Sequence, residues 1–325
     1  MINAVSVTNH FGKTLRCVLE DPESSGFSIT NIDGLTPGKS TVNIKDIATL
    51  DGGFFQRARL PARNIVLTYI FMDYIDGQYR SIEEARQTFY QYYVVKKTVK
   101  LEIETDSHKY VISGVVESNE PSIFSSDEGA QVSVLCPDPY FRLADSGISE
   151  EGSMSEVVFN PNGEFMFPFS NEFPYRRIKF GSNDEHITEN TVNIIYSGDV
   201  DTGIILRTKI TGTFNGNYID FEFYGDSAEN PKITELSFGD ILWRAAGGGL
   251  QLGDELVIST IPGNKYAVVK RGSQTINVFP YIQVLPSWIS LQKGDNIIKI
   301  KPGYILPSYP NVYITLEYPI LYLGV

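Results

Sequence analysis

The stretch QVSVLCPDPYF, from Gln131 to Phe141, sets the strictest limit on how this chain folds. Its first half alternates valines with polar residues, a pattern that predicts a β-strand. Pro137 and Pro139 cannot donate a backbone hydrogen bond to a neighbouring strand, and each favours an extended conformation in the residue before it. The strand is therefore expected to end at Cys136 and to continue as a stiff corner, which the two following aromatic residues anchor in apolar surface.

A polar segment without apolar periodicity follows this corner. Its sequence, ADSGISEEGSMSE, is rich in glycine and serine and runs from Ala144 to Glu156, which is typical of a linker. We therefore predict an N-terminal domain of residues 1–143, a linker of residues 144–156 and a C-terminal domain of residues 157–325.

The N-terminal part is predicted to be a sheet with a single helix. Alternating apolar and polar residues indicate a hairpin over Ala4–Leu19 and a strand pair formed by Val99–Thr105 and Lys109–Val116. Helical periodicity occurs over Ser81–Tyr93, where Ser81 can cap the first turn and Glu84 stands three residues later, as in a capping box. The fold class of this part is α+β.

Beyond the linker, helical periodicity disappears. Short β runs recur, separated by turn signals such as Asn162-Gly163, Asn215-Gly216 and Pro262-Gly263, and many short strands at this spacing indicate a β-sandwich or barrel. The tail from Gly303 to Val325 mixes prolines with aromatic residues and is expected to run along the surface as edge strands. The whole chain is thus predicted to be mainly β.

The charge balance argues against nucleic acids and anionic membranes as binding partners. The formal net charge is −12 and the sequence pI is about 4.8, and such a surface repels phosphate. The start of the sequence does not have the pattern of a secretory leader. The sequence contains no run of about 18 apolar residues, so we expect no membrane span or anchor. The two cysteines, Cys17 and Cys136, are expected to be reduced and buried in a chain made in a cytoplasm.

Residues with catalytic potential do not gather into a recognisable motif. The three histidines, His10, His108 and His186, have no other metal-binding residue at a suitable spacing. We expect no metal site and no cofactor.

A hydrolase is the enzymatic alternative. It would use two Asp-Ser/Thr-Gly triplets that begin at Asp145 and Asp201, because paired aspartates sharing a proton form the dyad of aspartic proteases. Isoleucines follow both glycines, where such proteases have Ser or Thr, and Asp145 falls in the predicted linker. We therefore interpret both triplets as turns and predict that the protein is not an enzyme.

Two sequence features suggest binding surfaces. Trp243 is a candidate for stacking on a sugar ring, whereas Trp288 lies in an apolar context that indicates core packing. Arg57, Arg59 and Arg63 follow a Gly-Gly pair at short spacing in an otherwise acidic chain.

Several stretches in a fixed order resemble a known family. DGGFFQRARLPARNIVL, SIEEARQTFYQYY and SVLCPDPYF precede GDVDTGI, LGDELVIST and LPSWISLQKGDNIIKI. Together they are similar to the distal tail proteins of siphophages, phages with long flexible tails, over nearly the whole chain. The resemblance rests on the order and spacing of these stretches.

The resemblance implies a structural hub of the virion tail. The N-terminal domain would be related to tail-tube proteins and would form a six-membered ring at the distal end of the tube. The C-terminal domain would be a galectin-like β-sandwich that contacts the receptor-binding apparatus. Implied partners are further copies of the chain, the tail-tube protein, the tail-associated lysin and receptor-binding proteins, with DNA passing through the ring without specific binding.

Ring formation gives the arginines an expected role. Arg57, Arg59 and Arg63 would reach carboxylates of the adjacent subunit, and an intrachain or solvated arginine is the alternative for each. The apolar strand Ile65–Met72 would become buried in contacts between neighbouring copies. A carbohydrate-binding adhesion module of the tail tip is the alternative function for the whole chain.

Overall fold

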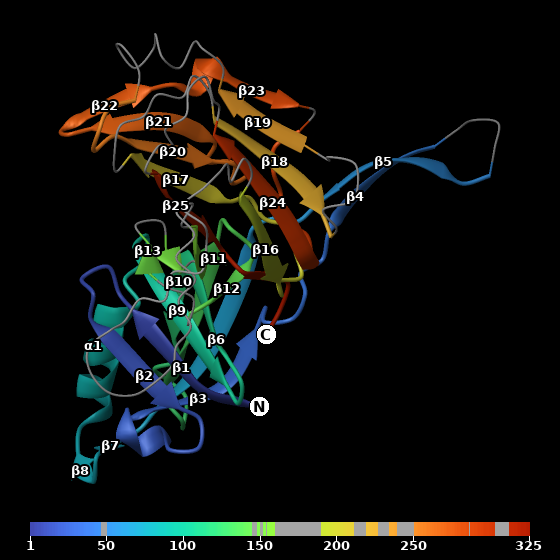
Figure 1. Ribbon diagram of the computed structural model, residues 1–325. Coiled ribbons are helices and arrows are strands. Elements are labelled where there is room, and N and C mark those ends of the chain that lie inside the picture. The colour runs from blue at the N-terminus through green and yellow to red at the C-terminus, as the bar shows by residue number, and fades with distance from the viewer. Residues whose placement is uncertain are drawn as a thin grey trace. The chain divides into compact units, whose positions relative to one another are not determined.

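A computed structural model describes residues 1–46, 51–144, 148–149, 152–153, 155–159, 190–210, 219–226, 234–238, 250–285, 287–302 and 312–325. The chain forms two compact units (Figure 1). The first comprises residues 1–145 and 321–325, and the second comprises residues 146–320. The described elements are mainly β-strands with one α-helix, which confirms the predicted fold class.

A nine-stranded antiparallel sheet forms the body of the first unit. Seven strands follow the order β2-β1-β9-β10-β11-β6-β3, and β12 pairs with both β10 and β26. The strands are β1 (Ile2–Thr8), β2 (Thr14–Val18), β3 (Phe27–Asp33), β6 (Arg63–Phe71), β9 (Thr98–Thr105), β10 (Lys109–Pro121), β11 (Gly129–Cys136), β12 (Phe141–Leu143) and β26 (Leu321–Tyr322). The same unit holds two separate ribbons, β4 (Thr41–Asp46) with β5 (Gly53–Arg59) and β7 (Tyr74–Ile75) with β8 (Gln78–Tyr79), and the 3-10 turn η1 (Pro22–Ser24).

Helix α1 (Ile82–Tyr92) begins where the sequence predicts. The Ser81 side chain accepts a hydrogen bond from the backbone N–H of Glu84 at 3.2 Å, so one of the unpaired donors of the first turn is satisfied. Ala85 and Phe89 are fully buried, which gives the helix the apolar stripe that packs against a sheet.

Strand β6 lies inside the sheet, between β11 and β3. Its buried side chains alternate, and the rings of Tyr69 and Phe71 lie 4.9 and 5.1 Å from the ring of Phe89. The Tyr69 hydroxyl also hydrogen-bonds the Tyr93 hydroxyl at 2.6 Å. The expectation that Ile65–Met72 serves contacts between copies is therefore wrong for its buried face, because these side chains share the core of the first unit with Phe89. Val66 and Ile70 lie on the opposite face and are partly exposed.

The predicted corner is present. Strand β11 ends at Cys136, immediately before Pro137, and Phe141 is fully buried two residues after Pro139. The corner leads into β12, which forms the short link between β10 and β26.

The second unit is a β-sandwich. One sheet has the order β15-β25-β17-β20-β21-β22 and the other β16-β24-β18-β19-β23. Its strands are β13 (Ile148–Ser149), β14 (Gly152–Ser153), β15 (Ser155–Phe159), β16 (Asn190–Tyr196), β17 (Ile205–Ile210), β18 (Ile219–Gly225), β19 (Thr234–Phe238), β20 (Glu255–Ser259), β21 (Tyr266–Arg271), β22 (Gln274–Asn277), β23 (Ile282–Leu285), β24 (Gly294–Pro302) and β25 (Val312–Tyr318), with the 3-10 turn η2 (Phe279–Tyr281). Leu206 and Ile258 from the first sheet share one core with Phe221 and Ile298 from the second, which is the arrangement of facing sheets.

The C-terminal tail does not consist of edge strands alone. Strand β25 lies between β15 and β17 in the larger sheet of the sandwich, so that part of the expectation is wrong. Of the two described strands of this tail, β26 takes a peripheral place, in the sheet of the first unit, where it pairs with β12.

An ion pair between the partly exposed Arg271 and the buried Asp254 supports the larger sheet of the sandwich. The Arg271 guanidinium donates to both carboxylate oxygens of Asp254, with Nη2 to Oδ2 at 2.7 Å and Nε to Oδ1 at 2.9 Å. Burial of Asp254 opposes ionisation, but the bonds from Arg271 and from the Gln251 N–H prevail and lower the pKa of the carboxyl.

We predict that Asp254→Asn lowers the free energy of unfolding of the second unit by about 2 kcal/mol at pH 7. Because the folded pKa lies below the unfolded pKa of about 3.9, this contribution is complete above the unfolded value and disappears as the pH falls through the folded value. Urea unfolding at pH 7 and pH 2.5 measures the difference, with Asp201→Asn on an exposed turn as the control for loss of one charge. An equal cost at both pH values would contradict the prediction.

Candidate functional site

The ribbon of β4 and β5, which we call the arm, is the most exposed part of the described chain. The two strands pair only with each other and interrupt the chain between β3 and β6 (Figure 1). Every residue of both strands is exposed, including Val42 at 49%, Ile44 at 59% and Phe55 at 57%. A two-stranded ribbon that buries none of its side chains is marginally stable alone, so a contact that covered the arm would stabilise it.

A β-bulge gives the arm two different faces. Asn43 pairs with Arg57 but Ile44 pairs with Phe55, which leaves Gln56 as the extra residue. Directly opposed residues share a face, and the face alternates along each strand. One face therefore carries four apolar side chains, Val42, Ile44, Phe55 and Ala58, with Asp46 at its outer end. The other face carries Thr41, Asn43, Lys45, Phe54, Arg57 and Arg59.

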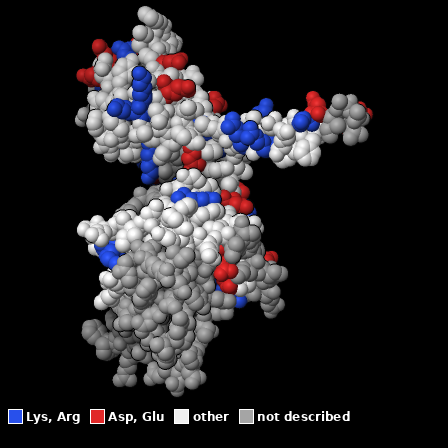
Figure 2. Space-filling view, turned by 90° about the horizontal axis from the view of Figure 1, so that it is seen from above, with Lys and Arg blue, Asp and Glu red and all other residues white. Residues whose placement is uncertain are grey.

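The structure separates the three predicted interface arginines. Arg57 and Arg59 lie on the exposed basic face of the arm, and Figure 2 shows Lys and Arg side chains gathered along this ribbon. Arg63 begins β6 instead and is only 6% exposed. The expectation that Arg63 reaches a neighbouring subunit is therefore wrong.

Arg63 binds backbone carbonyls of its own unit. Its Nε donates to the Pro139 oxygen at 2.7 Å, and Nη1 donates to the oxygens of Gly34 and Thr36 at 2.6 and 2.7 Å. Its Nη2 donates to the Leu323 oxygen at 2.6 Å. One guanidinium thus joins the start of β6, the segment after β3, the corner after β11 and the C-terminal residues, because its fixed fork of five donors can serve several acceptors at once.

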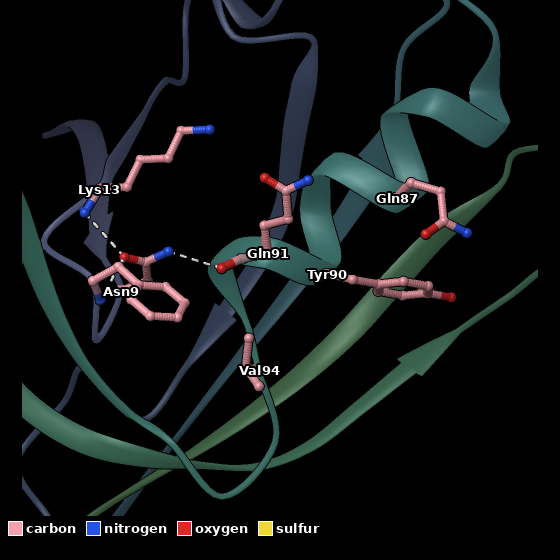
Figure 3. Close-up of a pocket in the computed structure, with 7 residues that line it drawn as sticks. Asn9, Lys13, Gln87, Tyr90, Gln91 and Val94 are labelled. Atoms are coloured by element: carbon pink, nitrogen blue, oxygen red, sulfur yellow. Dashed lines mark hydrogen bonds between the residues drawn. The ribbon is translucent and has the colours of Figure 1, made fainter.

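A groove borders the C-terminal half of α1. It has a volume of about 480 Å³ and is lined by Asn9, Phe11, Lys13, Gln87, Tyr90, Gln91 and Val94. Asn9 fixes its wall, since its Nδ2 donates to the Gln91 carbonyl at 2.8 Å and its Oδ1 accepts from the Lys13 N–H at 2.9 Å (Figure 3). We call this feature the helix groove. Its residues come from two segments that are distant in the sequence, so no local pattern indicates it.

The described residues offer no assembled catalytic or metal site. Within those residues no group of three or more His, Cys, Asp or Glu side chains could hold a metal ion, and no helix is long and apolar enough to cross a membrane. Both cysteines are free and buried, and burial raises the pKa of each thiol to about 11, so they stay protonated at neutral pH.

Several predicted residues lie outside the described chain. These are Asp145 of the supposed aspartate pair, His186 and Trp243. Trp288 is described and packs against the sandwich core. Its ring is stacked by Phe279 at 5.7 Å and covered by the Lys265 ammonium at 5.0 Å, so its neighbours already occupy the surface that a sugar would need.

Comparisons with known proteins identify the fold. No protein-family model and no curated protein matches the sequence. The solved structure of the SPP1 Dit (gp 19.1) protein, described as a paradigm of the hub adsorption apparatus of phages that infect Gram-positive bacteria, is similar with a TM-score of 0.58 and 12% identity, covering 96% of this chain and 98% of that one. A chain of the phage P2 baseplate in its activated conformation with Ca matches with a TM-score of 0.43 and 11% identity, over 98% of both chains. The chain therefore has the fold of the SPP1 Dit protein, a fold that extends through both of its units.

Proposed function

We propose that this protein is a structural component of a phage tail, a distal tail hub whose copies form a ring between the tail tube and the tail-tip apparatus. The observation that carries the proposal is the similarity to SPP1 Dit along 96% of this chain and 98% of that one. A match of this extent includes both units in the same order and leaves no large part of either chain unaccounted for. The ring would be a hexamer located in the virion tail.

The arm supports the proposal independently of that likeness. Its apolar face exposes Val42, Ile44 and Phe55, and neither of its two strands pairs with the nine-stranded sheet. Removing such an apolar surface from water by contact with a partner lowers the free energy of the system. A second copy is the natural partner, because head-to-tail contacts between identical chains generate closed rings.

The remaining partners follow from the same role. A hub of this kind would contact the tail-tube protein on one side and the tail-associated lysin and receptor-binding proteins on the other. DNA would pass through the ring without being held, since a net charge of −12 per chain opposes binding of phosphate.

The direct test is to measure the mass of the purified chain and to image it. Light scattering is expected to give a closed oligomer of about six copies, and negative-stain electron microscopy is expected to show rings with a central hole. A chain that stays monomeric at about 100 µM, well above the range of typical specific association, would refute self-assembly of the isolated protein.

Arg57 and Arg59 are expected to steer ring formation. We predict that Arg57→Glu/Arg59→Glu raises the concentration needed for half-assembly about tenfold, because exposed charges at the rim of an interface mainly affect association rate and salt dependence. Light scattering at low and high ionic strength measures this, and added salt should shrink the difference between the variant and the unmodified protein. Lys100→Glu, on β9, provides a control for reversing an exposed charge outside the arm. An equal effect of both changes would remove the case for arm-specific contacts.

A further inference from the structure

The loop between β10 and β11 exposes an apolar tip that the first unit does not cover. Phe124 is 99% exposed and Ile123 is 44% exposed. The base of the loop is fixed, since the Ser122 N–H donates to the Gly129 carbonyl at 2.9 Å and the Gly129 N–H donates to the Ser122 hydroxyl at 3.2 Å. A tip held on such a base loses little conformational freedom when it binds.

The helix groove has the complementary character. Phe11 lines it with apolar surface. Tyr90 and Val94 add further apolar surface, and Gln87 and Gln91 supply amide donors and acceptors (Figure 3). A groove of about 480 Å³ with a few polar groups is of the size and composition that take up protruding side chains.

Charge makes the two surfaces a matched pair. Lys13 lines the groove, the exposed Lys96 and Lys97 follow Val94 in the chain, and no carboxylate lines it. The loop instead carries the exposed Asp127 three residues after Phe124. The arm fits the helix groove less well than the loop does. Its basic residues, Lys45, Arg57 and Arg59, would meet Lys13 as like charges.

We propose that the Ile123–Phe124 tip of one copy inserts into the helix groove of the next copy, with Asp127 facing Lys13 of that groove. Phe124 does not occupy the groove of its own chain, because its side chain is almost completely exposed. Every copy carries one tip and one groove, so the contact is head-to-tail and leaves a free tip and a free groove until the ring closes. This inference rests on the proposed ring and adds a contact separate from the arm.

The test uses two variants of the full chain. The tip variant is Phe124→Asp, and the groove variant is Lys13→Glu/Gln87→Glu, which makes the groove acidic at two exposed positions. Each variant alone should need at least about tenfold more protein for half-assembly, the loss typical of a central interface residue. In an equimolar mixture, the intact tip of one variant can enter the intact groove of the other, so 1:1 pairs should form at a concentration at which each variant alone stays monomeric.

The controls separate this contact from other causes. Tyr79→Asp removes another exposed aromatic side chain, 72% exposed in β8, and should assemble normally. Below the concentration at which the unmodified protein assembles, all variants should keep its thermal unfolding temperature, since the changed side chains are exposed.

Each outcome has a distinct meaning. A tip variant that forms rings like the unmodified protein overturns this inference and leaves the proposed function standing. Variants that fail to pair in the mixture also overturn it, since the contact would then be symmetric or would belong to another tail protein. If the unmodified protein forms only open chains that depend on Phe124, the tip contact stands and the closed ring fails, whereas a monomeric protein overturns both.

Discussion

Arg63→Met is expected to lower the free energy of unfolding of the first unit by about 3 to 5 kcal/mol. The change keeps an apolar stem of similar length but leaves the carbonyls of Gly34, Thr36, Pro139 and Leu323 without their donor. A fully buried acceptor that loses its partner costs about 1 to 3 kcal/mol. The four bonds to Arg63 are only partly buried, so each carbonyl is expected to cost an amount near the lower end of this range. Urea unfolding of the full chain measures the loss in the transition of the first unit.

A local measurement distinguishes this role from a general loss of packing. The Val325 N–H donates to the Leu35 carbonyl at 3.0 Å, next to the Leu323 carbonyl that Arg63 binds. Hydrogen exchange at Val325 should therefore accelerate in Arg63→Met more than exchange in α1. Arg59→Met, which removes an exposed arginine nearby in sequence, should change stability by less than about 0.5 kcal/mol. Equal stability of the two variants would show that the guanidinium of Arg63 contributes nothing.

The second large effect is expected in the arm. Ile44→Asp/Phe55→Asp places two carboxylates on its apolar face and should raise the concentration for half-assembly by a factor of about 100 or more, since two central apolar contacts of about 2 kcal/mol each would be lost. Thermal unfolding below the assembly concentration should not change, because both side chains are more than half exposed in the single chain. Light scattering over a dilution series measures the shift.

Phe54→Asp supplies the matched control for the arm. Phe54 is adjacent to Phe55 and is 65% exposed, but the bulge places it on the opposite, basic face. It should therefore affect assembly much less than Phe55→Asp. If the two single changes had the same effect, the arm would not present one apolar face to its partner.

The proposed interaction surfaces were only partly predictable. Close spacing of basic residues in an acidic chain identified Arg57 and Arg59, and the alternation in Val42-Asn43-Ile44 could have indicated an apolar face. That face nevertheless depends on the bulge at Gln56, because without the extra residue Phe55 would lie on the basic face and Phe54 on the apolar one. Register between strands is a property of the pair, and neither strand specifies it alone.

The sequence by itself determined the features that depend on neighbouring residues. The Ser81 side-chain oxygen accepts from a free N–H of the first turn and so fixed the start of α1. Pro137 lacks an N–H and so fixed the end of β11. Both effects act within a few bonds of the residue. Alternation likewise indicated strands, and their number indicated a mainly β chain.

Only the tertiary structure decided which distant segments meet. Arg63 lies 260 positions from Leu323, and no local pattern distinguishes it from Arg57 or Arg59, yet burial against four carbonyls makes it a structural residue. The same holds for β26, which joins the sheet of the first unit from the far end of the chain. Long-range pairing is set by the free energy of the whole packed unit, so the role of such a residue becomes apparent only when its partners are in place.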